Sequence, residues 1–316
     1  MEIKVKKMLL KMLVCPACLP HELKLESNIV QEDDEDIFTA TLMCHECGRV
    51  YPIKNGTAFL DPTAINRKEK TDLKYETTPV LSSYMWSHYN DILDDSNRSP
   101  YGEWADLIRP ISGSALDAGC AVGRFSFEMA RRSDFVIGVD NSVSFVQSAR
   151  ELMINRRMKL ALQLEGRLTR QEMVCLPERW DSDKVEFIVG DAQALPFRSK
   201  TFSSLASLNL IDKMSLPIRH LEEMNRVAKE KDAQFLLSDP FSWSKDVADE
   251  KDWLGGTDGG PYSGRGMDNI KAIFKGENNG LLPAWRIEKD GYVWWKIRTH
   301  ENHFELIRSC YVKGDR

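Results

Sequence analysis

The strongest constraint on the fold is a strand, loop, helix, strand pattern between residues 114 and 140. SALDAG and FVIGVD are short apolar runs typical of buried strands, and the intervening FSFEMARR has helical character. Two strands joined through a helix pair in parallel, because the helix returns the chain to the same end of the sheet. The pattern therefore predicts an α/β fold.

The same alternation continues along the chain. A helix opened by Ser142 follows the second strand, and three further apolar segments read VEFIVGD, FSSLASLNL and AQFLLSD. The stretch PIRHLEEMNRVAKE, between the last two, has helical periodicity. This order predicts a doubly wound, mostly parallel sheet, whose ligand lies beyond the carboxyl ends of its strands.

The loop ALDAGCAVG, residues 115–123, follows the first of these strands. Its glycines miss the G-x-G-x-x-G register with which backbone N–H groups hold a pyrophosphate. Asp117 would repel phosphates, yet its carboxylate suits an amino or sulfonium group. Asp140 ends the second strand, 21 positions after Gly119, where a carboxylate can accept both ribose hydroxyls.

A third acidic residue ends the third strand. In VGDAQALPF, Asp191 can accept a hydrogen bond from an adenine amino group, and the Ala192 N–H can donate to a ring nitrogen. These residues favour a cationic nucleoside ligand over a dinucleotide.

In this order, the motifs ALDAGCAVG, VIGVDNS, VGDAQALPF and SLNLIDKMS resemble class I S-adenosylmethionine-dependent methyltransferases. The resemblance implies a Rossmann-like, seven-stranded sheet with two antiparallel strands at one edge, and S-adenosyl-L-methionine as cofactor. Ala121 stands where the family usually has its middle glycine. By resemblance the cofactor-binding residues are Asp117, Gly119 and Gly123 for the methionine part, Asp140 for the ribose, Asp191 and Ala192 for the adenine, and Asn209 near the methyl group; Asn141 is also expected to bind the cofactor.

Four of the seven cysteines form two pairs near the N-terminus. CPAC and CHEC give C-x2-C twice, separated by 25 residues. Each pair makes a tight knuckle, and two knuckles complete the tetrahedral sulfur shell that zinc prefers. Because all four positions would be filled by protein thiolates, the expected Zn²⁺ is structural. The predicted metal ligands are Cys15, Cys18, Cys44 and Cys47.

The segment around these cysteines, roughly residues 8–62, resembles the zinc-ribbon activator proteins of tRNA and translation-factor methyltransferases. Within it, CGRVYPIKNGTAFL predicts a strand, an Asn-Gly turn and a second strand. The resemblance implies a platform for docking a partner. We therefore expect a zinc-ribbon-like domain at 1–62, a polar linker at 63–74 and a methyltransferase domain at 75–316.

The flanks of the larger domain carry a second resemblance. YETTPVLSSYMWSHY, LEGRLT, SDPFSW, WLGG and KIRTHENHFELIRS are similar to the methyltransferase domain of ovothiol synthases and to stand-alone 4-mercaptohistidine N1-methyltransferases. This similarity implies N-methylation of a small imidazole or thiohistidine-like acceptor. The chain departs from ovothiol synthases, because it lacks their iron-dependent sulfoxide synthase domains and adds the zinc module.

Methyl transfer from a sulfonium is an in-line displacement, so the enzyme mainly aligns the reactants and excludes water. An imidazole nitrogen must be neutral to attack, and a nearby carboxylate or histidine could remove its proton. The catalytic candidates are Asn209, Asp212 and His300. The substrate-binding candidates are Tyr75, Tyr84, His88, Tyr89, Asp239 and His300. The aromatic residues fit a core stripe equally well, and each histidine could be a packed or surface residue.

The composition limits the kinds of binding partner that we expect for this chain. A net charge of −5 gives no general attraction to nucleic acid, and no segment has the run of about 20 apolar residues that a membrane span requires. We expect a cytoplasmic enzyme with a small-molecule acceptor. The alternative is an RNA or protein methyltransferase that uses the zinc module for substrate or partner docking. A third reading is a regulatory partner that keeps the cofactor fold without catalysis.

Overall fold

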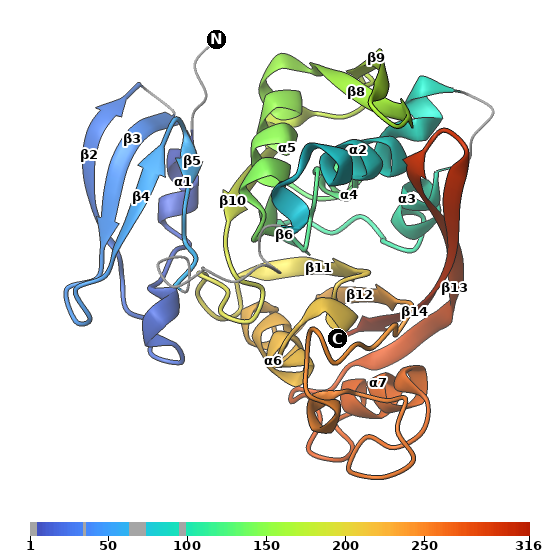
Figure 1. Ribbon diagram of the computed structural model, residues 1–316. Helices are drawn as coiled ribbons and strands as arrows, with labels where there is room; N and C mark the ends of the chain where they lie inside the picture. The colour runs from blue at the N-terminus through green and yellow to red at the C-terminus, as the bar shows by residue number, and fades with distance from the viewer. Residues whose placement is uncertain (1–4, 34–35, 63–73, 95–98) are drawn as a thin grey trace.

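The protein is described by a computed structural model that covers residues 5–33, 36–62, 74–94 and 99–316 (Figure 1). A small N-terminal β-rich module lies beside a larger α/β domain. The linker predicted at 63–74 falls outside the described residues, apart from Lys74. Among the described helices, none has the length and apolar character needed to cross a bilayer.

A single twisted sheet of seven strands forms the centre of the larger domain. Its order is β10-β7-β6-β11-β12-β14-β13, and the first five strands run in parallel. β14 is antiparallel to both of its neighbours, which confirms the predicted antiparallel edge. The strands are β6 (Ser114–Ala118), β7 (Phe135–Asp140), β10 (Val185–Val189), β11 (Phe202–Leu208), β12 (Gln234–Asp239), β13 (Arg286–His300) and β14 (His303–Asp315).

Helices cover both faces of this sheet, as the predicted doubly wound fold requires (Figure 1). Ser142 begins α5 as predicted, because its hydroxyl accepts a hydrogen bond from Phe145 N at 3.2 Å. One face carries α2 (Thr78–Leu93), α3 (Pro100–Ala105), α4 (Arg124–Met129) and α5 (Val143–Asn155), and the other carries α6 (Pro217–Val227) and α7 (Gly266–Phe274). Short 3₁₀ turns are η1 (Pro16–Cys18), η3 (Lys74–Glu76), η4 (Ser182–Lys184), η5 (Ile211–Lys213) and η6 (Glu250–Asp252).

The N-terminal module is a sheet in the order β1-β3-β4-β5, with β2 also paired to β3. Asn55 and Gly56 both have positive φ, 48° and 64°, so the predicted Asn-Gly turn connects β4 and β5. The spacer between the cysteine pairs forms the hairpin of β2 and β3. The module's elements are β1 (Val5–Lys6), α1 (Lys7–Leu10), β2 (Glu26–Glu32), β3 (Asp36–Met43), β4 (Val50–Lys54) and β5 (Thr57–Ala58).

The module docks on the β10 edge of the large sheet. Phe59 bridges Val189 in parallel, and Leu60 N donates to Val189 O at 2.7 Å. A second contact joins Val14 N to Pro196 O at 2.9 Å. The buried side chains of the module and those beneath α6 and α7 belong to one continuous hydrophobic cluster. The two units therefore share a core.

Between α5 and β10 the chain forms the hairpin of β8 (Arg157–Glu165) and β9 (Leu168–Cys175). Its strand β8 meets the far end of β13, where Arg298 Nη2 donates to Gln163 O at 2.9 Å. Glu301 N also donates to Leu164 O at 3.2 Å. The hairpin packs against α2 and α5, two helices on the same face of the sheet.

We predict that Phe197→Ala destabilises the whole chain, because Phe197 is fully buried where the module meets the domain and its ring packs 5.0 Å from that of Phe202. Removing a buried phenyl ring costs about 3–5 kcal/mol of unfolding free energy. Chemical denaturation measures this loss. Arg198→Ala is the control, since its exposed side chain can be removed while its backbone N–H still donates to Met12 O. Equal stability of the two variants would contradict a shared core.

Candidate functional site

The loop after β6 makes a tight turn at the carboxyl edge of the sheet. Gly119, Ala121 and Gly123 all have positive φ, at 74°, 45° and 83°. A Cβ added at Gly119 would lie 2.7 Å from Leu210 Cδ1, and one at Gly123 would lie 2.6 Å from Phe187 Cζ. Both positions therefore need glycine for backbone conformation and for space. Ala121 adopts the left-handed region despite its methyl group.

Asp140 lies beside this loop at the end of β7. Its two carboxylate oxygens accept hydrogen bonds from Ala121 N at 2.9 Å and Ser142 N at 2.8 Å. Part of the residue remains accessible to solvent, but burial raises the pKa of the Asp140 carboxyl group to about 6, although the backbone hydrogen bonds from Ser142 and Ala121 oppose the rise. Each oxygen keeps a lone pair, so the group can accept further hydrogen bonds from ligand hydroxyls. Asn141 follows it as an exposed residue at the start of α5.

Asp117 lies deeper, near the end of β6. Its side chain is 2% exposed, and Ser126 Oγ donates to its Oδ2 at 2.7 Å. Burial raises the pKa of Asp117 to about 7, against the opposing effect of the Ser126 hydrogen bond. The two acids at neighbouring strand ends thus form an electronegative position that a cation would stabilise.

The third predicted position follows β10. Asp191 Oδ1 accepts a hydrogen bond from Gln193 N at 2.8 Å, while Ala192 is almost fully buried. His220, a residue the sequence did not single out, holds Ala192 in place: Nδ1 lies 3.0 Å from Ala192 O and Nε2 lies 2.9 Å from Ser207 Oγ. Burial lowers the pKa of His220 to about 4, so the ring is neutral and can make one donor and one acceptor contact.

Asn209 follows β11 with a φ of 54°, a left-handed conformation that asparagine tolerates better than most residues. Its backbone N–H donates to Ser238 O at 2.7 Å, and its Oδ1 accepts from Ser309 Oγ at 2.5 Å. Ser309 lies on the antiparallel strand β14, a hundred residues away in sequence. The amide orientation of Asn209 is therefore fixed by the antiparallel strand β14, which sequence spacing could not associate with it.

Asp212 and Asp239 come together at the ends of β11 and β12. Asp212 N lies 3.4 Å from Asp239 Oδ2, and Asp212 Oδ2 accepts from Ser242 N at 2.9 Å and pairs with Lys213 Nζ at 3.1 Å. Burial raises the pKa of both carboxyl groups, and repulsion from Asp212 raises that of Asp239 further. Within the described part of the chain, Asp212 Oδ1 is buried without a hydrogen-bond partner. This oxygen is a free acceptor beside the site.

The predicted aromatic residues lie on α2 and its preceding turn. The Tyr84 ring lies 6.0 Å from Tyr75 and 4.7 Å from Phe145, while Tyr89 OH donates to Val122 O at 2.8 Å. Tyr89 is thus a packing residue behind the loop. Burial raises the pKa of the Tyr75 and Tyr84 phenols. The negative charges of Asp140 and Asp212 raise both pKa values further. These two rings line the site edge.

His88, one turn after Tyr84, is 5% exposed and stacks 4.5 Å from the ring of Tyr101. Burial and the nearby Arg124 lower the pKa of His88 to about 3, which keeps the imidazole neutral. Its Nδ1 has no hydrogen-bond partner among the described residues.

His300 lies elsewhere. It ends β13 at the hairpin tip, where its ring is 5.6 Å from His303 and its Nδ1 accepts from Asn302 N at 3.3 Å. Cys310 is the residue of this hairpin that lies level with the strand-end acids, because it pairs with Asp239 on β12 and with Tyr292 on β13. His300 lies eight positions after Tyr292, roughly 26 Å along β13. The structure thus does not bring His300 into contact with Asn209 or Asp212.

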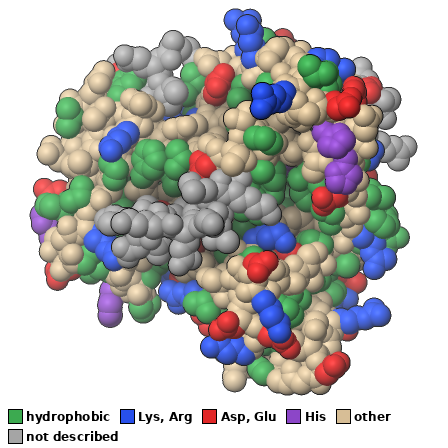
Figure 2. Space-filling view, in the orientation of Figure 1, with side chains coloured by type: hydrophobic (Ala, Val, Ile, Leu, Met, Phe, Trp, Pro, Cys, Tyr) green, Lys and Arg blue, Asp and Glu red, His purple; other side chains and the backbone are tan. Residues whose placement is uncertain are grey.

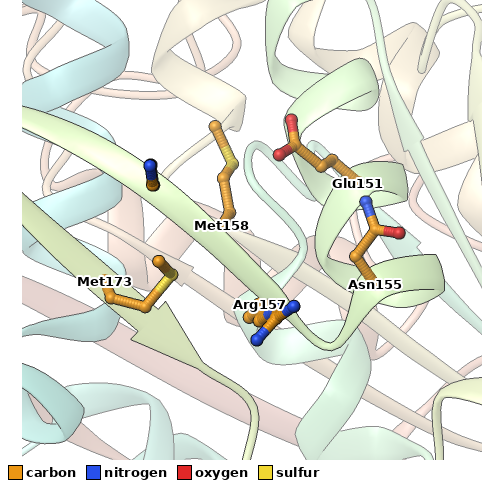
Figure 3. Close-up of a pocket in the computed structure, with 6 residues that line it drawn as sticks. Glu151, Asn155, Arg157, Met158 and Met173 are labelled. Carbon is orange, nitrogen blue, oxygen red and sulfur yellow. The ribbon is translucent and has the colours of Figure 1, made fainter.

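One hollow on the surface of the described residues lies away from this edge. It has a volume of about 560 Å³ and lies between the end of α5 and the β8–β9 hairpin (Figure 3). Glu151, Asn155, Arg157 and Met173 are among its lining residues. None of the predicted site residues lines it, and it is open on the outside. The strand-end residues remain the candidate site.

The four paired cysteines lie together in the N-terminal module. Their sulfur atoms all lie within 4.8 Å of one another, with Cys15 Sγ 3.7 Å from Cys47 Sγ and Cys18 Sγ 3.8 Å from Cys44 Sγ. A tetrahedral zinc ion with Zn–S bonds of about 2.3 Å needs S–S distances of about 3.8 Å. The cluster therefore fits zinc in both size and donor chemistry, and its four thiolates would leave no open coordination position.

We predict that Cys44→Ser removes bound zinc and lowers the midpoint of thermal unfolding, because a structural metal contributes its binding free energy to folding. Elemental analysis of the purified protein and a thermal scan measure the two effects. Cys175→Ser is the matched control, since this exposed cysteine lies outside the cluster. Full zinc content in Cys44→Ser would rule out the four-sulfur site.

Asp117→Asn should change how stability depends on pH. The pKa of Asp117 is about 7 in the folded protein against 3.8 for an ordinary aspartate, so folding binds its proton and wild-type stability falls as the pH rises between these values. Asparagine carries no such charge and can still accept from Ser126 Oγ. The unfolding free energy of the variant should therefore rise, relative to that of wild type, by up to about 4 kcal/mol between pH 4 and pH 8. Urea denaturation measures the unfolding free energy of both proteins at each pH. The same pH dependence in wild type and in Asp117→Asn would contradict a buried Asp117 that is protonated in the folded protein.

Comparisons with known proteins agree with this arrangement. Residues 116–233 match the family model described as a methyltransferase domain, and residues 6–56 match the Trm112p-like protein family. The first span contains Asp117, Asp140 and Asp191, and the second contains all four paired cysteines. No curated protein matches the chain.

Solved structures with a similar fold include several methyltransferases. YcgJ from Bacillus subtilis is 15% identical with a TM-score of 0.41, covering 69% of this chain and 98% of its own. A chain of the complex between the Haloferax volcanii Trm112 methyltransferase activator and a methyltransferase is 13% identical with a TM-score of 0.43, covering 74% and 96%. Haemonchus contortus phosphoethanolamine N-methyltransferase 2, in complex with S-adenosyl-L-methionine, is 17% identical with a TM-score of 0.41, covering 65% and 39%.

The ordered strand-end residues and the cysteine cluster thus coincide with two separate family matches. The chain is an enzyme that combines a class I S-adenosylmethionine-dependent methyltransferase domain with an N-terminal Trm112-like module.

Proposed function

We propose that this methyltransferase acts on a macromolecule, RNA or protein, and that its Trm112-like module serves as a permanently attached docking partner. The observation that carries the proposal is the fusion itself: the module packs on the β10 edge and shares one hydrophobic core with the catalytic domain. The sequence of this module resembles activators of tRNA and translation-factor methyltransferases. A shared core supports a fixed platform beside the site.

The strand-end residues fit S-adenosyl-L-methionine, which supplies a methyl group activated by its sulfonium. Asp140 would accept the ribose hydroxyls through the lone pairs left free by Ala121 N and Ser142 N. Asp117 would place negative charge near the cationic end. Asp191 would accept from the adenine amino group, and the Ala192 backbone, held by His220, would position the ring.

The acceptor side would be formed by Asn209, Tyr84 and the Asp212–Asp239 pair. Asp212 Oδ1 is buried with no partner among the described residues, so it can accept a proton or a hydrogen bond from an attacking amine or ring nitrogen. The raised pKa of Asp212 brings its carboxyl group closer to the range of a neutral-pH base. Asn209, oriented by Ser309, would direct the acceptor toward the methyl group.

A second candidate is a small imidazole or thiohistidine-like acceptor. The observation that favours it is the aromatic, largely enclosed surroundings of the site: Tyr84 packs against Tyr75 and Phe145, and neutral His88 lies one turn along α2 with a free Nδ1 among the described residues. An apolar enclosure of this kind suits a flat heterocycle. The flanking sequences that resemble ovothiol-type methyltransferases support the same reading.

An assay with labelled S-adenosyl-L-methionine distinguishes a macromolecular acceptor from a small imidazole acceptor. The full-length protein is offered bulk RNA, cell protein, 5-thiohistidine and histidine in parallel. The macromolecular proposal predicts label in RNA or protein. Label confined to the small imidazoles would overturn it in favour of the second candidate.

Asp140→Ala should weaken S-adenosyl-L-methionine binding at least about tenfold, because the carboxylate that would accept hydrogen bonds from both ribose hydroxyls is removed. Isothermal calorimetry measures the dissociation constant directly. Asp258→Ala is the control. It removes an aspartate side chain from an exposed loop and should bind S-adenosyl-L-methionine as wild type does. Unchanged affinity in Asp140→Ala would remove this residue from the cofactor site.

A further inference from the structure

The hairpin of β13 and β14 exposes an unusual surface, here called the hairpin face. It consists of Tyr292, Trp294 and Lys296 on β13 with Phe304, Leu306 and Arg308 on β14. Trp294 pairs with Arg308 and Lys296 pairs with Leu306, so their side chains project to the same side. The alternate residues Val293 and Trp295 are buried against the domain. The hairpin face is therefore the outer side of a well-anchored ribbon.

Large apolar side chains on this face are open to solvent. Exposure is 56% for Tyr292, 51% for Trp294, 45% for Phe304 and 63% for Leu306. Isolated exposed apolar residues are common, but four neighbouring ones with three aromatic rings indicate a contact surface.

Cations are placed on these rings. Arg308 Cζ lies 5.2 Å from the centre of Tyr292, and Lys296 Nζ lies 5.4 Å from that of Phe304. The six residues include no acid. Asp290, the next position on the same side, is neutralised by an ion pair with Lys271 at 2.8 Å. In a chain of net charge −5, the hairpin face is locally positive.

This surface begins at the level of the candidate site. Tyr292 pairs with Cys310, which in turn pairs with Asp239 at the carboxyl end of β12. Ser309, adjacent to Arg308, donates to Asn209. From there the ribbon extends past the carboxyl edge of the sheet, along the right of the molecule in Figure 1, where Figure 2 shows green and blue side chains gathered.

We infer that the hairpin face binds single-stranded RNA and leads one nucleotide into the methyl-transfer site. This inference rests on the proposed macromolecular function and names its substrate class. Bases would stack on Tyr292, Trp294 and Phe304, and phosphates would pair with Lys296 and Arg308. Rings interleaved with cations along a strand provide both contacts at once.

Two other occupants fit the face less well. A second copy that docked through the same face, as a two-fold dimer does, would bring Lys296 and Arg308 against like charges, which opposes association. An extended peptide would use the free backbone of the edge strand β13, for which the outward rings and cations are unnecessary. RNA would use the aromatic rings and the cations of the face together.

The test uses full-length protein and a fluorescent single-stranded oligouridylate, with fluorescence anisotropy at two salt concentrations. Wild type should bind, and more weakly at high salt. Trp294→Ala should lower affinity about tenfold, Trp294→Phe should keep most of it because a ring remains, and Arg308→Glu should both weaken binding and reduce the salt dependence. Lys251→Glu reverses one exposed charge outside the face and should bind almost as wild type does.

Thermal unfolding and S-adenosyl-L-methionine binding of each variant establish that the protein is folded. No oligonucleotide binding by wild type, or equal binding by Trp294→Ala, would overturn the hairpin face as an RNA site. If RNA is methylated but the variants act as wild type, RNA docks elsewhere and the proposed function stands. Label found only in protein would replace RNA by protein as substrate. Label found only in small imidazoles would overturn the proposed function itself.

Discussion

The structure depends on the parallel pairing of β6 between β7 and β11. Asp117 lies opposite Gly138 on one side and Ala206 on the other, so three strands end together at one edge. Parallel strands with helical crossovers bring residues distant in sequence to the same edge, and there Asp117, Asp140 and Asn209 meet the loop glycines. A register slip of one residue in β6 would turn the Asp117 side chain to the other face of the sheet.

Burial of acids at this edge has an electrostatic cost, and the surrounding backbone offsets part of it. Asp140 accepts two N–H donors, Asp117 accepts a hydroxyl, and Asp239 Oδ1 accepts Phe241 N at 2.7 Å. The raised pKa values of Asp117 and Asp140 show that the compensation is incomplete. A cationic ligand with hydroxyl groups would supply what is missing, so the site chemistry and the proposed cofactor are consistent.

The attached module and the hairpin lie at opposite ends of the sheet. The module covers the edge strand β10, which would otherwise expose unpaired backbone groups. At the other end β13 is the edge strand, and its hairpin projects beyond the carboxyl ends of the parallel strands. The strand-end residues thus lie between the N-terminal module at one end of the sheet and an aromatic, positively charged ribbon at the other.

The sequence by itself determined the alternating α/β fold, the strand-end acids and the four-cysteine cluster, because strand periodicity, Asp117, Asp140 and the C-x2-C spacing are local signals. It could not determine which distant residues complete the site. Ser309 orients Asn209 and His220 holds Ala192, contacts that exist only once β14 has joined the sheet beside β12 and α6 has packed on its face. Tertiary structure also separated His300 from the site and paired Asp212 with Asp239, because strand length and register, rather than spacing in sequence, set those distances.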